Sequence, residues 1–270
     1  LPLIEHYKKK CRWIWRCHLD LSRPDAETWK YLRRWIDGYD AVIVSCPEYK
    51  QEIKPSQHVF MPAIDPFTIK NRQFSDKEVD ERLAHYKIPT DLPFVVQVSR
   101  FDPWKDPKGV VEAFKLARKQ INARLVLLGN FATDDPEGEE IFRSLCACRD
   151  ERILILTSGD DTALVNALQT RAAVVLQKSL REGFGLTVAE AMWKGTPVIG
   201  GNVGGIRYQI EDGVNGFLVS SVEETAKRIV ELVNDRELRD EMGAKARETV
   251  RRNFLLTRYL EQYLDLFGVL

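Results

Sequence analysis

Short apolar runs alternate with segments of helical periodicity along most of the chain. The alternation is typical of helices packed on a parallel sheet, because strands buried on both faces are almost continuously apolar. Ser221-x-x-Glu224 predicts a capping box before a helix that carries Ile229 and Val233. The pattern predicts an α/β fold with strands at residues 94–98, 124–128, 152–156, 173–176, 197–199 and 217–219.

The first sixty residues contain fewer predicted elements. Residues 12–19 and 41–45 are predicted strands, and residues 26–38 are a predicted helix with one apolar side. Two strands cannot form a doubly wound domain, the chain begins with Leu1 rather than methionine, and two Rossmann-like domains together need about 300 to 400 residues. We therefore expect that an N-terminal portion is missing.

We expect three parts in this chain. Residues 1–92 would be the C-terminal part of a first domain with the interdomain linker, and residues 93–252 a nearly complete second domain. Within the linker region, Ser75-x-x-Glu78 predicts a short capped helix. Residues 253–270 would be a final helix, whose apolar stripe consists of Leu256, Leu260, Tyr263 and Phe267.

Composition narrows the class of partner. Lys and Arg total 40, and Asp and Glu also total 40, so the balance of charge does not favour nucleic acid or an anionic membrane surface. A neutral small-molecule substrate fits better. No apolar run approaches eighteen residues and no signal peptide is visible, so we expect a cytoplasmic protein without membrane spans.

Neither the cysteines nor the acidic run at 134–137 indicates a metal site. Five scattered cysteines match no disulfide or zinc framework, and Cys146-x-Cys148 lacks the two-residue spacer of redox and zinc pairs. We expect most of them to be core residues. Asp134-Asp135-Pro136-Glu137 is interpreted as a turn followed by acids that favour the start of a helix.

Residues 180–195 carry the most informative motif. Glu182 and Glu190 lie eight positions apart around a glycine turn that opens a helix between two predicted strands. Glu190 falls about one helical turn inside, within reach of ribose hydroxyls, and Glu182 lies at the turn, where a hexose would bind. The arrangement predicts a sugar nucleotide site, although a glycine pair before a helix is common and a single helical Glu usually contacts water.

The glycines of this turn suit an anion. Gly183 and Gly185 allow a tight turn and a close approach of the backbone to a ligand. A helix that begins here directs its first amides at that ligand. A diphosphate would bind the amides of Phe184, Leu186 and Thr187.

Two cations follow the strand that ends at Val98. Arg100 and Lys105 lie on a loop at the carboxyl end of that strand, which is the edge where open parallel sheets bind ligands. Arg offers a planar fork and Lys a compact charge, so together they suit a departing diphosphate. A solvated loop with surface cations is the alternative.

His18 lies at the end of the first predicted strand, facing a cleft. It is a candidate site residue, although a lone histidine is also compatible with an interior or loop role. Tryptophans stack on sugars but more often belong to a core, and that alternative applies to Trp13, Trp15, Trp29 and Trp35.

Two other nucleotide sites are disfavoured. Val203-Gly-Gly-Ile206 is a close-approach turn but lacks the Gly-x-Gly-x-x-Gly spacing of nicotinamide sites. The chain also contains no Gly-x4-Gly-Lys-Ser/Thr motif, which argues against a P-loop phosphotransferase.

Three segments carry a resemblance to a known family, and the resemblance extends over the whole chain. They are Trp15-Arg-Cys-His-Leu-Asp-Leu-Ser22, Ser99-Arg-Phe-Asp-Pro-Trp-Lys105 and Arg181-Glu-Gly-Phe-Gly-Leu-Thr-Val-Ala-Glu-Ala-Met-Trp-Lys-Gly195. They resemble the retaining glycosyltransferases of two-Rossmann-domain (GT-B) architecture with the Glu-x7-Glu motif, the family 4 type, and within it the trehalose-forming members. One departure is Asp106, at a position where the family often has glycine.

The resemblance implies a function. Residues 93–252 would bind the donor, the first domain would bind the acceptor, and the final helix would return to the acceptor domain. The reaction would move glucose from UDP-glucose or ADP-glucose to glucose, giving α,α-trehalose with retention. Glu182, Arg100, Lys105 and His18 would be the catalytic residues, and substrate would bind Gly183, Phe184, Gly185, Leu186, Thr187 and Glu190.

Several points stay open at this stage. Another acceptor, such as a sugar phosphate, lipid or glycan, or a nucleotide-sugar-binding module without turnover, remains compatible with the residues. A phosphorylase would use inorganic phosphate in place of a nucleotide. No cofactor or metal is expected, since the cations and helix amides supply the positive charge. The base contact is expected near Thr157 and Ser158, and a homodimer is left open.

Overall fold

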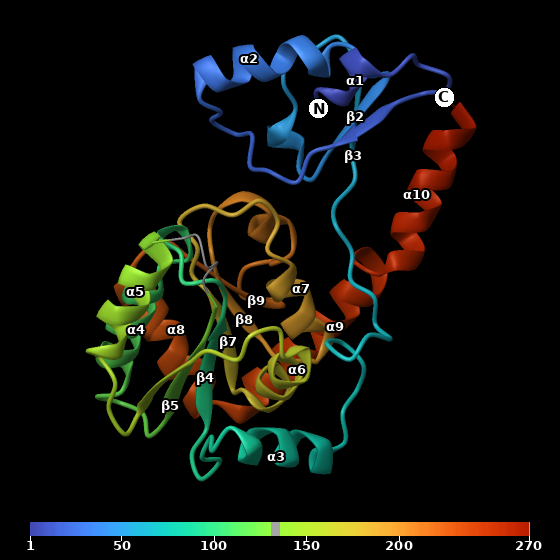
Figure 1. Ribbon diagram of the computed structural model, residues 1–270. Coiled ribbons are helices and arrows are strands. Elements are labelled where there is room, and N and C mark those ends of the chain that lie inside the picture. Colours follow the sequence, from blue (N-terminus) through green and yellow to red (C-terminus); the bar gives the residue numbers. More distant parts are fainter. Residues whose placement is uncertain (131–135, 270) are drawn as a thin grey trace.

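The computed structural model describes residues 1–130 and 136–269, which form a smaller and a larger α/β unit (Figure 1). Each unit contains one sheet, three-stranded in the smaller and six-stranded in the larger. Asp134 and Asp135 of the acidic run lie outside the described residues. The helix expected after them begins at once, as α5 (Pro136–Cys146).

The larger sheet is parallel throughout the strand pairs that the structure describes. Its strands are β4 (Phe94–Val98), β5 (Arg124–Leu128), β6 (Ile153–Leu156), β7 (Val174–Gln177), β8 (Val198–Gly201) and β9 (Gly216–Val219). The spatial order β6-β5-β4-β7-β8-β9 places β4 beside β7, with Val95 opposite Val174. The order therefore reverses between β4 and β7, which creates the crevice where doubly wound sheets bind ligands.

Helices cover both faces of this sheet, which explains why its strands are continuously apolar. Successive residues of β4 illustrate the two sides, since Val95 and Val96 belong to different core clusters. One face packs against α4 (Pro107–Ala117), α5 and α8 (Val222–Asn234). The other packs against α3 (Asp76–His85), α6 (Thr162–Arg171), α7 (Leu186–Trp193) and α9 (Arg236–Asn253).

The smaller sheet corrects one expectation, because it has a third strand. Its parallel strands are β1 (Ile14–Arg16), β2 (Ala41–Val44) and β3 (Ser56–Val59), with β2 in the centre. The third strand escaped detection because Ser56, Gln57 and His58 are polar and lie at the sheet edge. The first strand is shorter than the predicted 12–19, and α2 (Ala26–Ile36) begins at an Asp25 cap.

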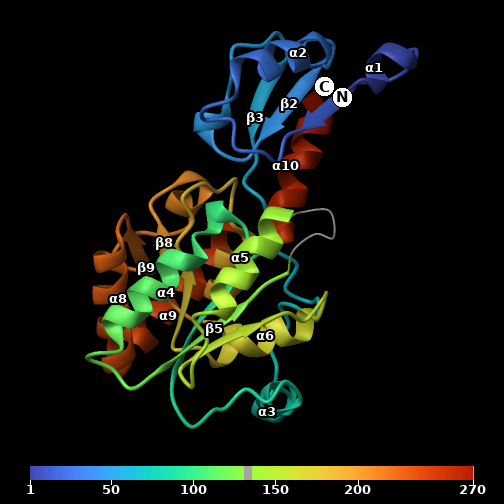
Figure 2. The ribbon, with the colours of Figure 1, turned by 60° about the vertical axis from the view of Figure 1, so that its left-hand side comes forward.

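The final helix α10 (Leu256–Val269) returns to the smaller unit, as expected (Figure 2). Its predicted stripe is wrong, however, because Leu256, Leu260 and Phe267 are exposed. The side chains that pack on the smaller sheet are instead Tyr259, Tyr263 and Leu266, against Ile43 and Phe60. The helical period was correct, but the phase could not be chosen, since apolar residues occur on both sides of α10.

The predicted caps are present, with one difference. Ser75 and Glu78 form a reciprocal capping box on α3. Ser221 accepts from the Glu224 amide at 3.0 Å, but the Glu224 carboxylate accepts from the Ser220 amide rather than from that of Ser221.

The expectation that most of the cysteines are core residues is wrong. Cys17 and Cys46 are buried, whereas Cys11 is exposed and the two others are half-buried, so most are not core residues. Across residues 1–130 and 136–269, no helix combines the length and the apolar character that crossing a membrane requires.

Candidate functional site

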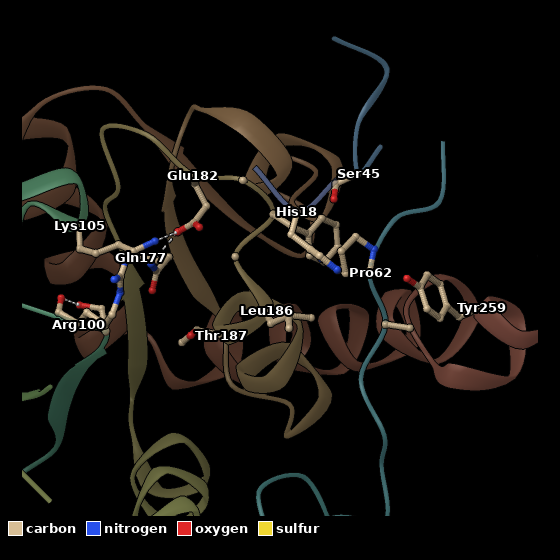
Figure 3. Close-up of a pocket in the computed structure, with 15 residues that line it drawn as sticks. His18, Ser45, Pro62, Arg100, Lys105, Gln177, Glu182, Leu186, Thr187 and Tyr259 are labelled. Atoms are coloured by element: carbon tan, nitrogen blue, oxygen red, sulfur yellow. Dashed lines mark hydrogen bonds and ion pairs between the residues drawn. The ribbon is translucent and has the colours of Figure 1, made fainter. Parts of the chain in front are cut away.

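A cavity of about 490 Å³ opens at the carboxyl ends of β4 and β7, between the two units (Figure 3). The sheet order reverses there, so the cavity occupies the crevice of the doubly wound fold. Most of the predicted site residues line it: His18, Arg100, Lys105, Glu182, Gly183, Phe184, Gly185, Leu186 and Thr187. Their roles remain predictions, but their proximity is a property of the structure.

Glu182 is held by three donors on one carboxylate oxygen. Its Oε2 accepts from Lys105 Nζ at 2.6 Å and from Gln177 Nε2 at 3.2 Å (Figure 3). The same oxygen accepts from Ser179 Oγ at 3.1 Å. Its side chain is 10% exposed and that of Lys105 is 17% exposed. The carboxylate is therefore ionically paired and fixed at the cavity wall, rather than mobile.

The helix after the turn presents an uncapped N-terminus to the cavity. Gly185 is the N-cap of α7, with a φ of 82° that favours glycine and without a side-chain cap. The first amides of α7 at Leu186 and Thr187 lie at the cavity, where both residues are lining residues. An anion bound there would receive amide hydrogen bonds and the favourable end of the helix dipole.

The cationic loop, which carries Arg100 and Lys105, places both cations at the cavity, but the two have different partners. Arg100 is 66% exposed, and its Nη2 contacts Asp102 Oδ2 at 3.0 Å, whereas Lys105 is committed to Glu182. Asp106 stands where the family that this chain resembles often has glycine, and its backbone is left-handed, with a φ of 48°. Glycine adopts that conformation freely, and Asp106 tolerates it while capping α4 and pairing with Lys178.

The smaller unit supplies His18 and Ser45, which follow β1 and β2 at the carboxyl edge of its sheet. Partial burial lowers the pKa of His18, and the charge of Arg16 lowers it further. A neutral imidazole at neutral pH offers one donor and one acceptor to a ligand.

The turn at Glu182 is also fastened from the smaller unit. Tyr49, at the end of the 3₁₀ helix η1 (Pro47–Tyr49), places its hydroxyl 2.9 Å from the carbonyl oxygens of both Glu182 and Gly183. A Cβ on Gly204 would lie 1.8 Å from the Glu182 carbonyl oxygen, so the chain approaches that closely only with glycine there. The turn is therefore enclosed from two sides.

Glu190 does not line this cavity. It is 4% exposed, and its Oε1 lies 2.8 Å from Lys70 Nζ. A second cavity of about 270 Å³ adjoins the first, because both include Ser99, Arg100 and Thr187 among their lining residues. Lys70 lines this second cavity, as does Ser158, whereas the other residue expected near the base, Thr157, is not among its lining residues.

Sequence reasoning missed several cavity residues. Gln177 and Ser45 stand at the carboxyl ends of parallel strands, so their position alone was a usable signal. Gln177 also has a buried Oε1 without a hydrogen-bond partner among the described residues. Tyr259 comes from α10 and gave no such signal, since it reaches the cavity only because that helix returns.

A metal centre is not among the sites in the part of the chain that the structure describes. Within residues 1–130 and 136–269, no three His, Cys, Asp or Glu side chains gather in a way that could hold an ion.

Comparison with known proteins agrees with this geometry. Residues 1–51 match the family described as trehalose synthase, N-terminal domain. The trehalose synthase of Pyrococcus horikoshii is 45% identical over 275 residues, covering 99% of this chain and 66% of the relative. The trehalose phosphorylase of Pleurotus pulmonarius is 26% identical, covering 93% of this chain and 40% of the relative. The chain thus spans 66% of the length of the first of these relatives.

The fold also has solved counterparts. The Anabaena protein HepE in complex with UDP-glucose superposes with a TM-score of 0.81 at 20% identity, covering 95% of this chain and 72% of that protein. This likeness confirms the predicted α/β fold with GT-B architecture. The longer of the two family matches is to the family described as glycosyl transferases group 1, over residues 78–249. The chain belongs to that family of glycosyltransferases.

Proposed function

We propose that this chain carries the donor site, and part of the acceptor site, of a retaining transferase that makes α,α-trehalose from a nucleoside diphosphate glucose and glucose. The bond from the glucose anomeric carbon to the diphosphate oxygen breaks, and a bond from that carbon to an acceptor hydroxyl oxygen forms. The acceptor proton leaves toward the departing diphosphate. Acceptor attack and departure take place on the same face, which retains the anomeric configuration.

One observation carries the proposal: Glu182, Lys105, the open helix N-terminus and His18 meet in a single cavity between the two units. The helix amides and Arg100 are suited to bind the diphosphate and to stabilise the charge that develops on it. The solved structure of the Anabaena protein HepE, which shares this fold, contains UDP-glucose, and this supports a nucleotide sugar as donor. Glucose as acceptor is supported by the relatives named trehalose synthase, because trehalose consists of two glucose units.

The hexose would lie between the two units. The buried Gln177 Oε1 lacks a partner among the described residues and would accept from a sugar hydroxyl. Glu182 Oε2 is already saturated by three donors, so the carboxylate acts in orienting sugar hydroxyls through its remaining oxygen. Among the described residues that line the cavity, none pairs a nucleophile with an adjacent base, so stabilisation of the leaving group is the proposed source of the rate enhancement.

Two alternatives have specific support. A nucleotide-sugar-binding module without turnover is the alternative if acceptor binding needs residues of the trehalose synthase beyond the 66% that this chain spans. The likeness to trehalose phosphorylase favours a reaction with inorganic phosphate, which would need phosphate and no nucleotide.

Product analysis separates these functions. The 270-residue chain is incubated with ¹³C-labelled glucose and a mixture of UDP-glucose and ADP-glucose, and products are followed by NMR. An α,α-trehalose signal supports the transferase. A different labelled glycoside assigns another acceptor chemistry, and trehalose cleavage that depends on phosphate assigns the phosphorylase. Nucleotide binding without any product leaves the binding module.

A further inference from the structure

Each of the two glutamates around the helix start is paired with a lysine from a distant segment. Glu182 pairs with Lys105 of the cationic loop at 2.6 Å, and Glu190 pairs with Lys70 of the interdomain linker at 2.8 Å. The first pair belongs to the site described above. The second pair has no role so far, although Glu190 lies on α7, the helix that follows the turn of Glu182.

Glu190 has an unmet hydrogen-bonding requirement. The carboxylate is 4% exposed, and its Oε2 is buried without a hydrogen-bond partner among the described residues. Leaving a charged acceptor unpaired in the interior is costly, so such an atom calls for a donor that is not part of the protein. Ribose hydroxyls are donors of the required kind.

Lys70 is held in place by its neighbours in the linker. The Asn166 side-chain amide donates to the carbonyls of Ile69 at 2.7 Å and Arg72 at 2.8 Å, and the Trp193 indole donates to the carbonyl of Asn71 at 3.1 Å. Side chains of α6 and α7 therefore donate hydrogen bonds to the backbone on both sides of Lys70. These hydrogen bonds fix the backbone that carries Lys70 relative to α6 and α7.

Lys70 also reaches ligand space, whereas Glu190 beneath it lines neither cavity. Lys70 lines the second cavity, beside Ser99, Arg100 and Thr187, which it shares with the first. Another lysine, Lys194, lies behind Glu190, with its Nζ 3.1 Å from the Glu190 carbonyl oxygen rather than from the carboxylate. Lys70 is thus the cation in contact with the carboxylate itself.

We infer that Lys70 is a positioning residue of the ribose subsite: it fixes the Glu190 carboxylate so that Oε2 faces the ribose hydroxyls of a bound nucleoside diphosphate. This inference rests on the proposed donor. It makes the linker between the two units a component of donor recognition, because the lysine is carried by the segment that also connects them. If Lys70 instead occupied the place of the ribose, Lys70→Gln would strengthen the binding of a ribonucleotide rather than weaken it.

The test compares ribose and dideoxyribose ligands. Calorimetry measures the Kd of UDP, ADP and their 2′,3′-dideoxy analogues for the wild-type chain, Lys70→Gln, Lys70→Arg and the control Lys77→Gln, an exposed lysine on α3. Lys70→Gln should weaken the preferred ribonucleotide about tenfold, the scale of a hydrogen bond to a charged group, and leave its dideoxy analogue nearly unchanged. Lys70→Arg should restore most of the affinity, and Lys77→Gln should match the wild type.

Each other outcome has a defined meaning. If Lys70→Gln binds as well as the wild type or more tightly, or loses both analogues alike, the inference is overturned. If the wild type does not distinguish ribose from dideoxyribose, Glu190 has no ribose contact and the inference also fails. If the wild type binds no nucleoside diphosphate, the proposed donor itself is wrong. Should Lys70→Gln not fold by circular dichroism, Lys70→Met, which keeps the aliphatic stem, replaces it under the same criteria.

Discussion

The two units build parallel sheets from similar apolar strands, yet they complete their cores differently. In the larger unit both sheet faces are covered by helices of the same unit, and most strand residues are buried. In the smaller unit α2 covers one face, while the other is covered by α10 from the far end of the chain. Ile43 of the central strand shows this directly, because it packs with Phe60 and Leu266.

This difference teaches how the cavity is supported. The larger unit brings the cations, Glu182 and the helix N-terminus together on a closed core, whereas the smaller unit brings His18 and Ser45 on a sheet that depends on distant packing. We therefore expect the chemistry of the diphosphate to be set in the larger unit. The contribution of the smaller unit to the cavity is expected to vary with how firmly the two units are joined.

The largest effect is expected from matched substitutions in the cores of the two units. Ile199→Ala and Ile43→Ala each truncate a fully buried isoleucine on an internal strand. Ile199→Ala should lower the free energy of unfolding by about 2 to 5 kcal/mol and lower the main thermal transition. Ile43→Ala should instead lose hydrogen-exchange protection in β2, β3 and α10 while that transition changes little. An equal fall of the main transition in both would mean that the units unfold as one.

Next in size is the effect of removing charge at the cavity. Arg100→Ala or Glu182→Ala should lower turnover about a hundredfold or more, if each acts as a preorganised partner of the transition state. Steady-state rates with the donor that the product analysis identifies provide the measurement, and Lys115→Ala on the exposed side of α4 is the control. Turnover near that of the wild type in either variant would remove the residue from the mechanism.

A pH dependence of stability should follow from Lys194. Burial lowers its pKa to about 7, although the nearby Glu190 raises it in part. Between that value and its ordinary one near 10.5, the unfolded chain holds more protons than the folded one, so this group makes stability rise with pH, by at most about 1.4 kcal/mol per pH unit. Denaturant unfolding at pH 7 to 9 should show the rise in the wild type and a smaller one in Lys194→Met. Identical slopes would show that Lys194 is charged in the folded state throughout.

A smaller effect is expected where the units meet. Tyr49→Phe removes the hydroxyl that contacts the Glu182 and Gly183 carbonyls and should cost about 1 kcal/mol, or about fivefold in turnover, with nucleotide affinity unchanged. Tyr39→Phe is the matched control, because that hydroxyl donates to the Leu1 carbonyl away from the cavity. If nucleotide affinity fell as much as turnover, Tyr49 would support donor binding rather than the joining of the units.

The smallest expected effect is zero. Incubation with EDTA should leave turnover unchanged, since Arg100, Lys105 and the helix amides are proposed to carry the charge that a metal ion carries in other phosphate chemistry. Turnover is measured before and after chelation. Loss of activity that a divalent ion restores would contradict that division of roles.

The sequence allowed most of the larger unit to be predicted. Its strands are apolar on both faces, so each appeared as a continuous run with a loop after it, and the caps at Ser75 and Ser221 marked helix starts. The smaller unit was harder, because β3 is a polar edge strand and α10 has apolar residues on more than one side. Local pattern does not determine which side a distant partner covers.

The candidate site follows the same division. Residues adjacent in sequence to a glycine turn or a strand end were found, as with Glu182 and Lys105. Those that depend on long-range contacts were not: Tyr259 arrives with the returning helix, Tyr49 reaches across the units, and Lys70 covers Glu190 from the linker. Such contacts join segments with no common sequence motif, which is why only the fold reveals them.

The path of the chain between the two units has a mechanical consequence. It crosses twice, once before α3 and once before α10, and the two crossings lie side by side in parallel: the Ile64 amide donates to the Phe254 carbonyl at 2.8 Å, and the Leu256 amide donates to the Ile64 carbonyl at 3.2 Å. A single connecting segment would let the units rotate about it, whereas two segments joined by hydrogen bonds bend together and resist twisting. Opening and closing of the cavity is therefore expected to follow one axis through residues 64 and 255, so that His18 and Glu182 separate and meet again in the same register.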